Sequence, residues 1–287
     1  MSPSDSSAVV SAAMRFRGER RPVLVCQAEA DFVEVASAAR ARGAEEGVAL
    51  VYGLAAPRAI EALGWASLGP VPALVRPLRL SYAAERLRLP AVASALLPRV
   101  PLLAPFGFRR RVGVREITSL PADVRITRLW DRFSVDVGVA LERTTKFFGW
   151  RIHDRVGSPY RIFIFEDGDR YAIRAMCIFS IKEERGASVG YVMELLHDRS
   201  VTGMRAASHL LGLALREMSD AGAESARALS LPHSGSYPIF ALHAFLSAPE
   251  PTGPSRALAV CPLDSDIEDA VTMRDRWYVS YVDAMEV

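Results

Sequence analysis

Two side chains that could accept a proton lie close together at the end of one apolar stretch of this 287-residue chain. Glu194 interrupts residues 192–196, which are otherwise apolar, and His197 follows them. A half-buried carboxylate can have its pKa raised toward neutrality and then act as a general base, and the pKa of a histidine suits the same task. The alternatives are a Glu194 carboxylate paired with a nearby arginine and a structural histidine at a strand end. The pattern predicts an acid–base site and leaves both alternatives open.

The segment that follows has the form of an anion-binding site. Residues 191–197 read as a strand, a short loop carries Thr202 and Gly203, and one long amphipathic helix comes next. Gly222 ends this helix, where glycine favours a left-handed cap. Free backbone N–H groups and the helix dipole point toward a ligand at the start of such a helix, so we expect an anion there. The apolar residues at helical spacing are Met204, Ala207, Leu211, Ala214, Leu215 and Met218.

Composition narrows the functional classes. The chain has 35 basic and 33 acidic residues, a net charge of +2, and no basic run interleaved with aromatics, which argues against a nucleic-acid partner. No charge-free apolar stretch reaches about 18 residues, so no membrane span is expected. The first residues lack the pattern of a secretory signal, and we expect a cytoplasmic protein. Cys26, Cys177 and Cys261 are widely spaced, which predicts buried hydrophobes and no metal site.

Periodicity and turn residues predict the order of strands and helices. In the first part we expect a loose tail over residues 1–20, strands over 23–26, 48–52 and 73–75, and helices over 32–46 and 58–63. Prolines interrupt residues 81–122, which predicts a linker; a segment lying on a membrane surface is the alternative. After it we expect strands over 125–129, 161–165, 171–181, 191–197, 226–231, 257–260 and 277–282, and helices over 130–143, from 204 to Gly222, and over 239–245.

The two parts of the chain repeat one pattern. Residues 27–65 and 202–245 both run loop, helix, glycine, strand, short helix and aromatic residue. Gly64 and Trp65 correspond to Ala244 and Phe245. This predicts two related domains, the first lacking its opening strands; chance agreement of helix lengths is the alternative. An antiparallel meander followed by strand–helix–strand predicts an α/β (α+β) fold with mixed sheets and helices on both faces.

This order resembles the acetyl-CoA-binding half of GNAT-superfamily acyltransferases, in which a strand, a glycine loop, a helix and a strand precede a helix that ends in Gly-Phe or Gly-Trp. Trp150-Arg151, Pro159-Tyr160 and residues 277–283 resemble tandem-GNAT proteins, distantly similar to Fem aminoacyl-transferases, found among bacterial polysaccharide genes. The resemblance covers residues 22–80 and 123–287. It implies two GNAT-like sheets: a truncated one over 21–80 and a complete one over 123–287, joined by the Pro-rich linker 81–122.

The resemblance also implies a donor and its site. An acyl-CoA, such as acetyl-CoA, would donate to a small amine such as an amino sugar, with Leu196, Thr202, Gly203, Met204, Arg205 and Ala207 at the donor. The family's phosphate loop has the form R/Q-x-x-G-x-G/A. Residues 200–205 keep Gly203, but Ser200 and Arg205 depart from it; a register two residues later keeps only Ala207. Arg205 would crowd the phosphate or bind it. In the first half, Glu29 makes a phosphate site at residues 27–30 unlikely, and residues 15–20 are a rival loop.

The catalytic pattern is incomplete. Glu194 or His197 would take the proton of the amine. The family's general-acid tyrosine falls on Phe240, or on Ile60 in the first half, so Tyr237 would have to substitute. Three hypotheses follow: an N-acyltransferase, a GNAT-like binding or scaffold module without activity, and aminoacyl transfer from tRNA, for which a net charge of +2 offers no basic channel. An exposed edge of the short first sheet would allow a homodimer.

Overall fold

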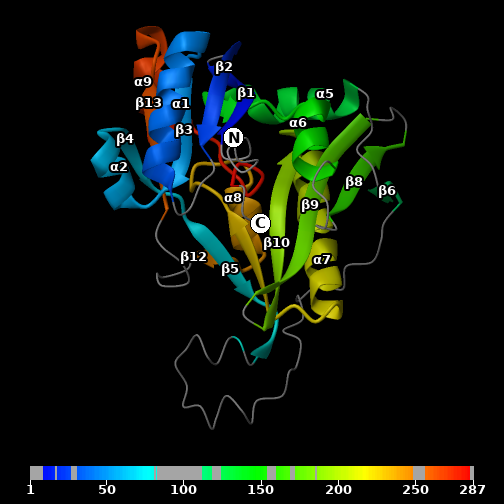
Figure 1. Cartoon of the computed structure of the whole chain (residues 1–287). Coiled ribbons are helices and arrows are strands. Elements are labelled where there is room, and N and C mark those ends of the chain that lie inside the picture. Colours follow the sequence, from blue (N-terminus) through cyan, green and yellow to red (C-terminus); the bar gives the residue numbers. More distant parts are fainter. Residues whose placement is uncertain are drawn as a thin grey trace.

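The computed structural model describes residues 9–16, 18–26, 31–80, 82, 112–117, 124–153, 160–168, 172–184, 186–247 and 256–284. These residues form two mixed sheets with helices packed against them (Figure 1). This confirms the predicted fold class. In the described part of the chain, no helix combines the length and apolar character that crossing a membrane requires.

The first sheet has six strands in the order β4-β13-β3-β2-β1-β7. A hairpin of β1 (Val9–Phe16) and β2 (Glu19–Cys26) leads through α1 (Phe32–Glu46) to β3 (Leu50–Ala55), which runs parallel to β2. Helix α1 ends at Gly47, which has the left-handed φ of 67° that glycine adopts at low cost. Helix α2 (Pro57–Leu63) follows β3. The other strands of this sheet are β4 (Ala66–Pro70), β7 (Val139–Leu141) and β13 (Ala257–Pro262).

The second sheet has seven strands in the order β12-β5-β11-β10-β9-β8-β6. Its long central strands β9 (Ala172–Glu184) and β10 (Ala187–His197) are antiparallel, and α7 (Val201–Asp220) connects β10 to the parallel strand β11 (Ser225–Leu229). The remaining elements are β5 (Ala73–Pro77), β6 (Val114–Ile117), α5 (Val124–Phe133), α6 (Thr145–Phe148), β8 (Arg161–Asp167), α8 (Tyr237–Leu242), β12 (Leu246–Ser247), α9 (Glu268–Val271), the 3-10 turns Ser134–Asp136, Ser265–Ile267 and Arg274–Arg276, and the π turn Gly149–His153.

The two sheets exchange strands. Strand β5 comes from the first part of the chain but pairs with β11 and β12 of the second sheet. Strand β13 comes from the last part but pairs with β3 and β4 of the first sheet. Figure 1 shows cyan β5 among the yellow and green strands and β13 beside blue α1. The predicted boundaries at residues 80 and 123 therefore do not separate two self-contained sheets.

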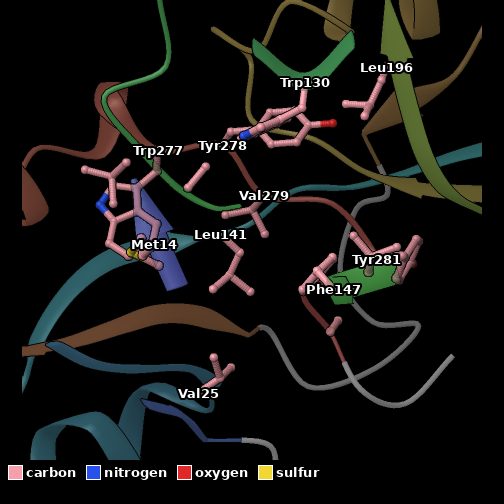
Figure 2. Close-up of a cluster of buried hydrophobic side chains, with 14 of the residues drawn as sticks. Met14, Val25, Trp130, Leu141, Phe147, Leu196, Trp277, Tyr278, Val279 and Tyr281 are labelled. Atoms are coloured by element: carbon pink, nitrogen blue, oxygen red, sulfur yellow. The ribbon is translucent and has the colours of Figure 1, made fainter. Parts of the chain in front are cut away.

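One hydrophobic core joins the two sheets. Figure 2 shows Met14 and Val25 of the first sheet in the same cluster as Trp130 of α5, Leu196 of β10 and the segment from Trp277 to Tyr281. Trp130 and Tyr278 have ring centroids 6.0 Å apart. The C-terminal residues thus lie between the sheets.

The predicted repeat has a counterpart in backbone geometry. Helices α2 and α8 are both followed by a residue with left-handed φ, 63° at Gly64 and 55° at Ala244. In both places the amide of the following residue donates to a carbonyl of the preceding helix: Trp65 to Ile60 at 3.3 Å, and Phe245 to Phe240 at 3.0 Å. Each half also contains a hairpin, a connecting helix and a parallel strand. The prediction that the first half lacks its opening strands is therefore wrong, because β1 and β2 form its hairpin.

Several local predictions are wrong. The tail predicted over residues 1–20 holds β1 from Val9. The structure has α5, a 3-10 turn and β7 where a strand over 125–129 and a helix over 130–143 were predicted. Residues 277–282 form no strand; apart from one bridge between Val139 and Trp277 they are irregular. The linker prediction lies mostly outside the described residues, which include β6 at its end. The three cysteines are buried, as predicted.

Candidate functional site at the carboxyl ends of β10 and β11

Strands β10 and β11 part before β10 ends. They pair from Val189 to Val192 on β10, whereas β10 continues to His197. At the point of parting the register with β9 shifts between Val192 and Glu194, a bulge that leaves Met193 unpaired. A bulge re-aims the side chains beyond it. Met193 and Leu196 consequently face the core between the sheets, whereas Leu195 faces α7.

The edge of β10 that β11 leaves is covered by other parts of the chain. The carbonyl of Met193 accepts a hydrogen bond from the Val282 amide at 3.2 Å, and the carbonyl of Leu195 accepts one from Ser236 Oγ at 2.7 Å. Residues two apart on a strand present their carbonyls to the same edge. The C-terminal segment and the loop after β11 therefore occupy the gap between the two strands.

Glu194 lies in a buried charged cluster. Its carboxylate accepts hydrogen bonds from Arg143 Nε at 2.7 Å, Ser280 Oγ at 3.0 Å, Tyr278 OH at 2.5 Å and its neighbour's amide, Leu195 N, at 3.1 Å. Four donors match the number of lone-pair sites on a carboxylate. The structure thus shows the arginine-paired alternative, and in this arrangement the Glu194 carboxylate offers no lone pair to a substrate.

Asp283 completes the cluster. It accepts from Arg143 Nη1 at 2.9 Å and Nη2 at 2.6 Å, the two-pronged geometry that favours arginine over lysine. Burial raises the pKa of Glu194, opposed by Arg143. Burial alone would lower the pKa of Arg143, but Asp283 and Glu194 raise it. Two carboxylates thus share one guanidinium, whose carbon also lies 5.1–5.5 Å from three aromatic ring centres: Trp130, Phe147 and Tyr278.

A second buried arginine holds the same C-terminal segment. Arg151 is 0% exposed and donates from Nε to the Val282 carbonyl at 2.8 Å and from Nη2 to the Tyr281 carbonyl at 3.4 Å and to the Ala284 carbonyl. These carbonyls belong to a turn that forms no strand. Arg143 and Arg151 together fix the C-terminal segment against β10.

The raised pKa of Glu194 predicts a pH dependence of stability. A carboxyl group that binds its proton more tightly in the folded state contributes stability below its unfolded pKa, here 4.5, and loses it as pH rises through the folded pKa. We expect the wild type to lose stability relative to Glu194→Gln over this range. Urea unfolding of both proteins between about pH 4.5 and 8 measures the difference, and a constant difference would contradict the raised pKa.

The N-terminus of α7 is occupied by the chain's own carboxylate. Asp198 is 2% exposed; its Oδ1 accepts from the Ser200 amide at 3.1 Å and from the Ser200 hydroxyl, while Oδ2 accepts from Arg174 Nη1 at 2.8 Å. Burial would raise the pKa of Asp198, but the bonds from Ser200 and Arg174 lower it. Ser200 Oγ in turn caps the helix through the Gly203 amide at 2.9 Å.

The Asp198 carboxylate also explains why residue 203 is glycine. A Cβ added at Gly203 would lie 2.1 Å from Asp198 Oδ1 and 2.6 Å from its carbonyl oxygen. The glycine thus makes room for an internal anion. The start of α7 has the backbone arrangement predicted for an anion site, but the Asp198 carboxylate occupies it. The side chain of Arg205 is exposed.

The other residues predicted to hold the donor are spread over different environments. Leu196 and Ala207 are 0% exposed and belong to the core. Thr202 and Arg205 are exposed near the start of α7, and Met204 there is 42% exposed. Only the last three present side chains to a ligand outside the helix.

The remaining acid–base candidates lie on either side of the parting strands. Both ring nitrogens of His197 face backbone carbonyls, Nδ1 that of Asp198 at 2.7 Å and Nε2 that of Gly235 at 3.2 Å. Its ring stands edge-on to Phe133, 5.5 Å away. Tyr237 is half-buried as the first residue of α8 and packs on the α7 side of the sheet.

Sequence reasoning missed the partners of Glu194 and the role of Asp198. Arg143 and Asp283 lie 51 and 89 positions from Glu194 in the numbering, so local spacing does not connect them. A carboxylate on an apolar strand does predict a cationic partner, because buried charges are paired. The role of Asp198 was predictable from the sequence, because this residue lies just before the helix whose start was predicted to bind an anion.

Comparison with known proteins finds similarity in structure alone. No protein-family model and no curated protein matches the sequence. Saccharomyces cerevisiae N-myristoyltransferase with bound myristoyl-CoA superimposes with a TM-score of 0.59 and 13% identity, over 88% of this chain and 62% of that one. A GCN5-related N-acetyltransferase from Anabaena variabilis gives 0.52 and 10% identity, over 88% and 58%. This chain spans less than two thirds of either protein. Its two sheets have the GNAT-like fold of these N-acyltransferases.

Proposed function

We propose that this protein is an acyl-CoA-dependent N-acyltransferase whose donor binds at the carboxyl ends of β10 and β11. The observation that carries the proposal is the parting of these parallel strands at the Met193 bulge, next to the start of α7. In open α/β sheets, ligands bind in the crevice beyond the carboxyl ends of the strands. Fold neighbours with myristoyl-CoA bound support an acyl-CoA as the donor class.

The reaction is direct attack by an amine on the thioester carbonyl. The nitrogen forms a bond to the carbonyl carbon, the tetrahedral intermediate expels the thiolate, and the amine gives up one proton. Glu194 would receive that proton once its bond with Tyr278 or Ser280 opens, with His197 as the other candidate. Tyr237, the half-buried first residue of α8, would protonate the thiolate. A small amine such as an amino sugar is the proposed acceptor, and acetyl-CoA the simplest donor.

The donor's phosphates would meet the start of α7, where Thr202, Met204 and Arg205 are exposed. The Asp198 carboxylate lies at the same helix end and repels a second anion. We therefore expect the exposed Arg205 guanidinium, rather than the loop amides alone, to contribute to phosphate binding.

This arrangement predicts that Asp198→Asn binds the donor more tightly. An asparagine retains an acceptor for Ser200 but removes the negative charge, so we expect the Kd of acetyl-CoA to fall by about tenfold, which corresponds to ~1.4 kcal/mol. Calorimetric titration measures the change. Asp167→Asn is the matched control, because Asp167 pairs with the same Arg174, at 2.8 Å, but belongs to β8 and not to the loop before α7. Equal affinity of both variants for acetyl-CoA would contradict phosphate binding at α7.

A second candidate is a GNAT-like binding or scaffold module without activity. It is favoured by three groups of internal contacts near the end of β10: Asp198 at the helix start, Val282 and Ser236 on the β10 edge, and the four donors around Glu194. On this alternative, neither wild type nor Asp198→Asn binds acetyl-CoA or longer acyl-CoAs, and neither shows a thermal shift with them.

A further inference from the structure

Arg76 on β5 is a buried arginine with an unusual environment. Arg76 is 7% exposed, and its Nη1 donates a hydrogen bond to the His243 carbonyl at 2.9 Å. Within the described ranges no carboxylate pairs with it. By contrast, buried Arg143 bonds two carboxylates. A guanidinium removed from water without an anion is costly, so a compensating partner is expected.

His243 connects Arg76 to a hydroxyl group on α7. The carbonyl of His243 accepts from Arg76, and its Nε2 lies 2.9 Å from Ser208 Oγ. Burial, with the positive charge of Arg76, lowers the pKa of His243 to about 4, so the imidazole is neutral near pH 7. Guanidinium, imidazole and hydroxyl thus come from β5, the end of α8 and the middle of α7.

The cluster lies close to solvent. Ser208 is partly exposed, and the neighbours of His243 are exposed on both sides, with Leu242 at 71% and Ala244 also exposed. One turn before Ser208 on α7, Met204 is 42% exposed. The surface around the α7–α8 junction is therefore in contact with solvent.

We propose that Arg76, Ser208 and His243 form a binding site for a small oxyanion, either a carboxylate or a phosphate group. The guanidinium supplies charge and paired N–H donors, which suit the planar oxygens of both groups, and the Ser208 hydroxyl supplies a further donor. The site lies between α7 and α8 and is distinct from the start of α7, where Asp198 already fills the anion position. It does not rest on the proposed acyl transfer.

A capping role is the competing explanation. An arginine can bond the last carbonyl groups of a helix, and the His243 carbonyl lies at the end of α8. The two explanations differ in one consequence. A capping arginine stabilises the protein without any ligand, whereas an uncompensated buried charge destabilises it until an anion binds.

The test is thermal unfolding of the full chain in sodium phosphate and, separately, in sodium acetate, with ionic strength held constant by NaCl. We expect a saturable rise in Tm of about 5 °C near 100 times the Kd with at least one anion; which of them acts identifies the class. Arg76→Met should lose this rise and should have a higher Tm than wild type without anion. The control Arg79→Met removes a neighbouring arginine that donates to the Ser219 carbonyl near the end of α7 at 2.6 Å, and it should keep the rise.

Two kinds of result would overturn the inference. One is the absence of a saturable rise with either anion, or an equal rise in Arg76→Met, which would be a general salt effect. The other is an Arg76→Met chain that unfolds at a lower temperature than wild type in anion-free buffer or does not fold, which would establish the capping role.

Discussion

Replacing Arg143 with methionine is expected to lower the free energy of unfolding by about 3–5 kcal/mol. Arg143 is 0% exposed and is the guanidinium that Glu194 and Asp283 share. Methionine keeps part of the apolar stem but leaves two buried carboxylates facing each other without a cation. Urea unfolding at pH 7 measures the loss through the midpoint at constant slope.

An exposed arginine provides the matched control. Arg161 also bonds two carboxylates, Glu116 at 2.7 Å and Glu217 at 2.8 Å, but its side chain is 33% exposed. Arg161→Met should therefore cost only about 0–1 kcal/mol. Adding Glu194→Gln and Asp283→Asn to Arg143→Met should restore part of the loss, because the unpaired charges are then gone. An Arg143→Met protein within about 1 kcal/mol of wild type would contradict a structural role for the cluster.

Ending the chain after Arg276 is expected to abolish folding. The removed segment buries five large side chains: Trp277, Tyr278, Val279, Tyr281 and Val282. At about 1.5–3 kcal/mol for each buried side chain, the loss of about 8–15 kcal/mol equals the whole stability of a typical domain. Circular dichroism should show no cooperative thermal transition in the truncated chain.

A milder variant is Arg151→Met, which keeps the segment but removes the guanidinium that bonds its carbonyls. Three carbonyls then lose a hydrogen bond from the guanidinium, although the Tyr281 carbonyl still accepts from the Ala284 amide at 3.1 Å. A folded but less stable protein is expected. A truncated chain that folds cooperatively would show that residues 277–284 cover β10 without being required for the core. In that case the segment could be removed without unfolding the protein.

Local sequence patterns predict the parts of the fold that local chemistry determines. Helix α7 follows from its apolar stripe, and α1 and α2 follow from their terminal glycines, Gly47 and Gly64. The repeat follows too: Ala244 takes the backbone conformation of Gly64 although alanine rarely adopts it. Residues 125–129 alone do not show the helical period, which is why a strand was predicted there. Over ten residues, Ile126, Leu129, Trp130 and Phe133 recur at helical spacing and are all buried in α5.

The unpredicted features depend on contacts between distant residues. Strand exchange places β5 beside β11 and β13 beside β3, and no local pattern distinguishes this from pairing within each half. Residues 277–282 are rich in aromatic residues and valine, as strands often are, but they form no strand, and Arg151 bonds the carbonyls of Tyr281 and Val282 instead. The bulge at Met193, which turns Glu194 toward Arg143, likewise has no local sequence signal.

Hydrogen exchange in the presence of acetyl-CoA and of myristoyl-CoA tests the proposed function most directly. Donor binding at the carboxyl ends of β10 and β11 predicts that at least one of them slows amide exchange in residues 193–205, at the end of β10 and the start of α7, and in residues 230–237, which lead from the loop after β11 into α8. Residues 23–53 of the first sheet should be unchanged. Unchanged exchange throughout the chain at saturating acyl-CoA, or slowing confined to the first sheet, would contradict donor binding at the carboxyl ends of β10 and β11.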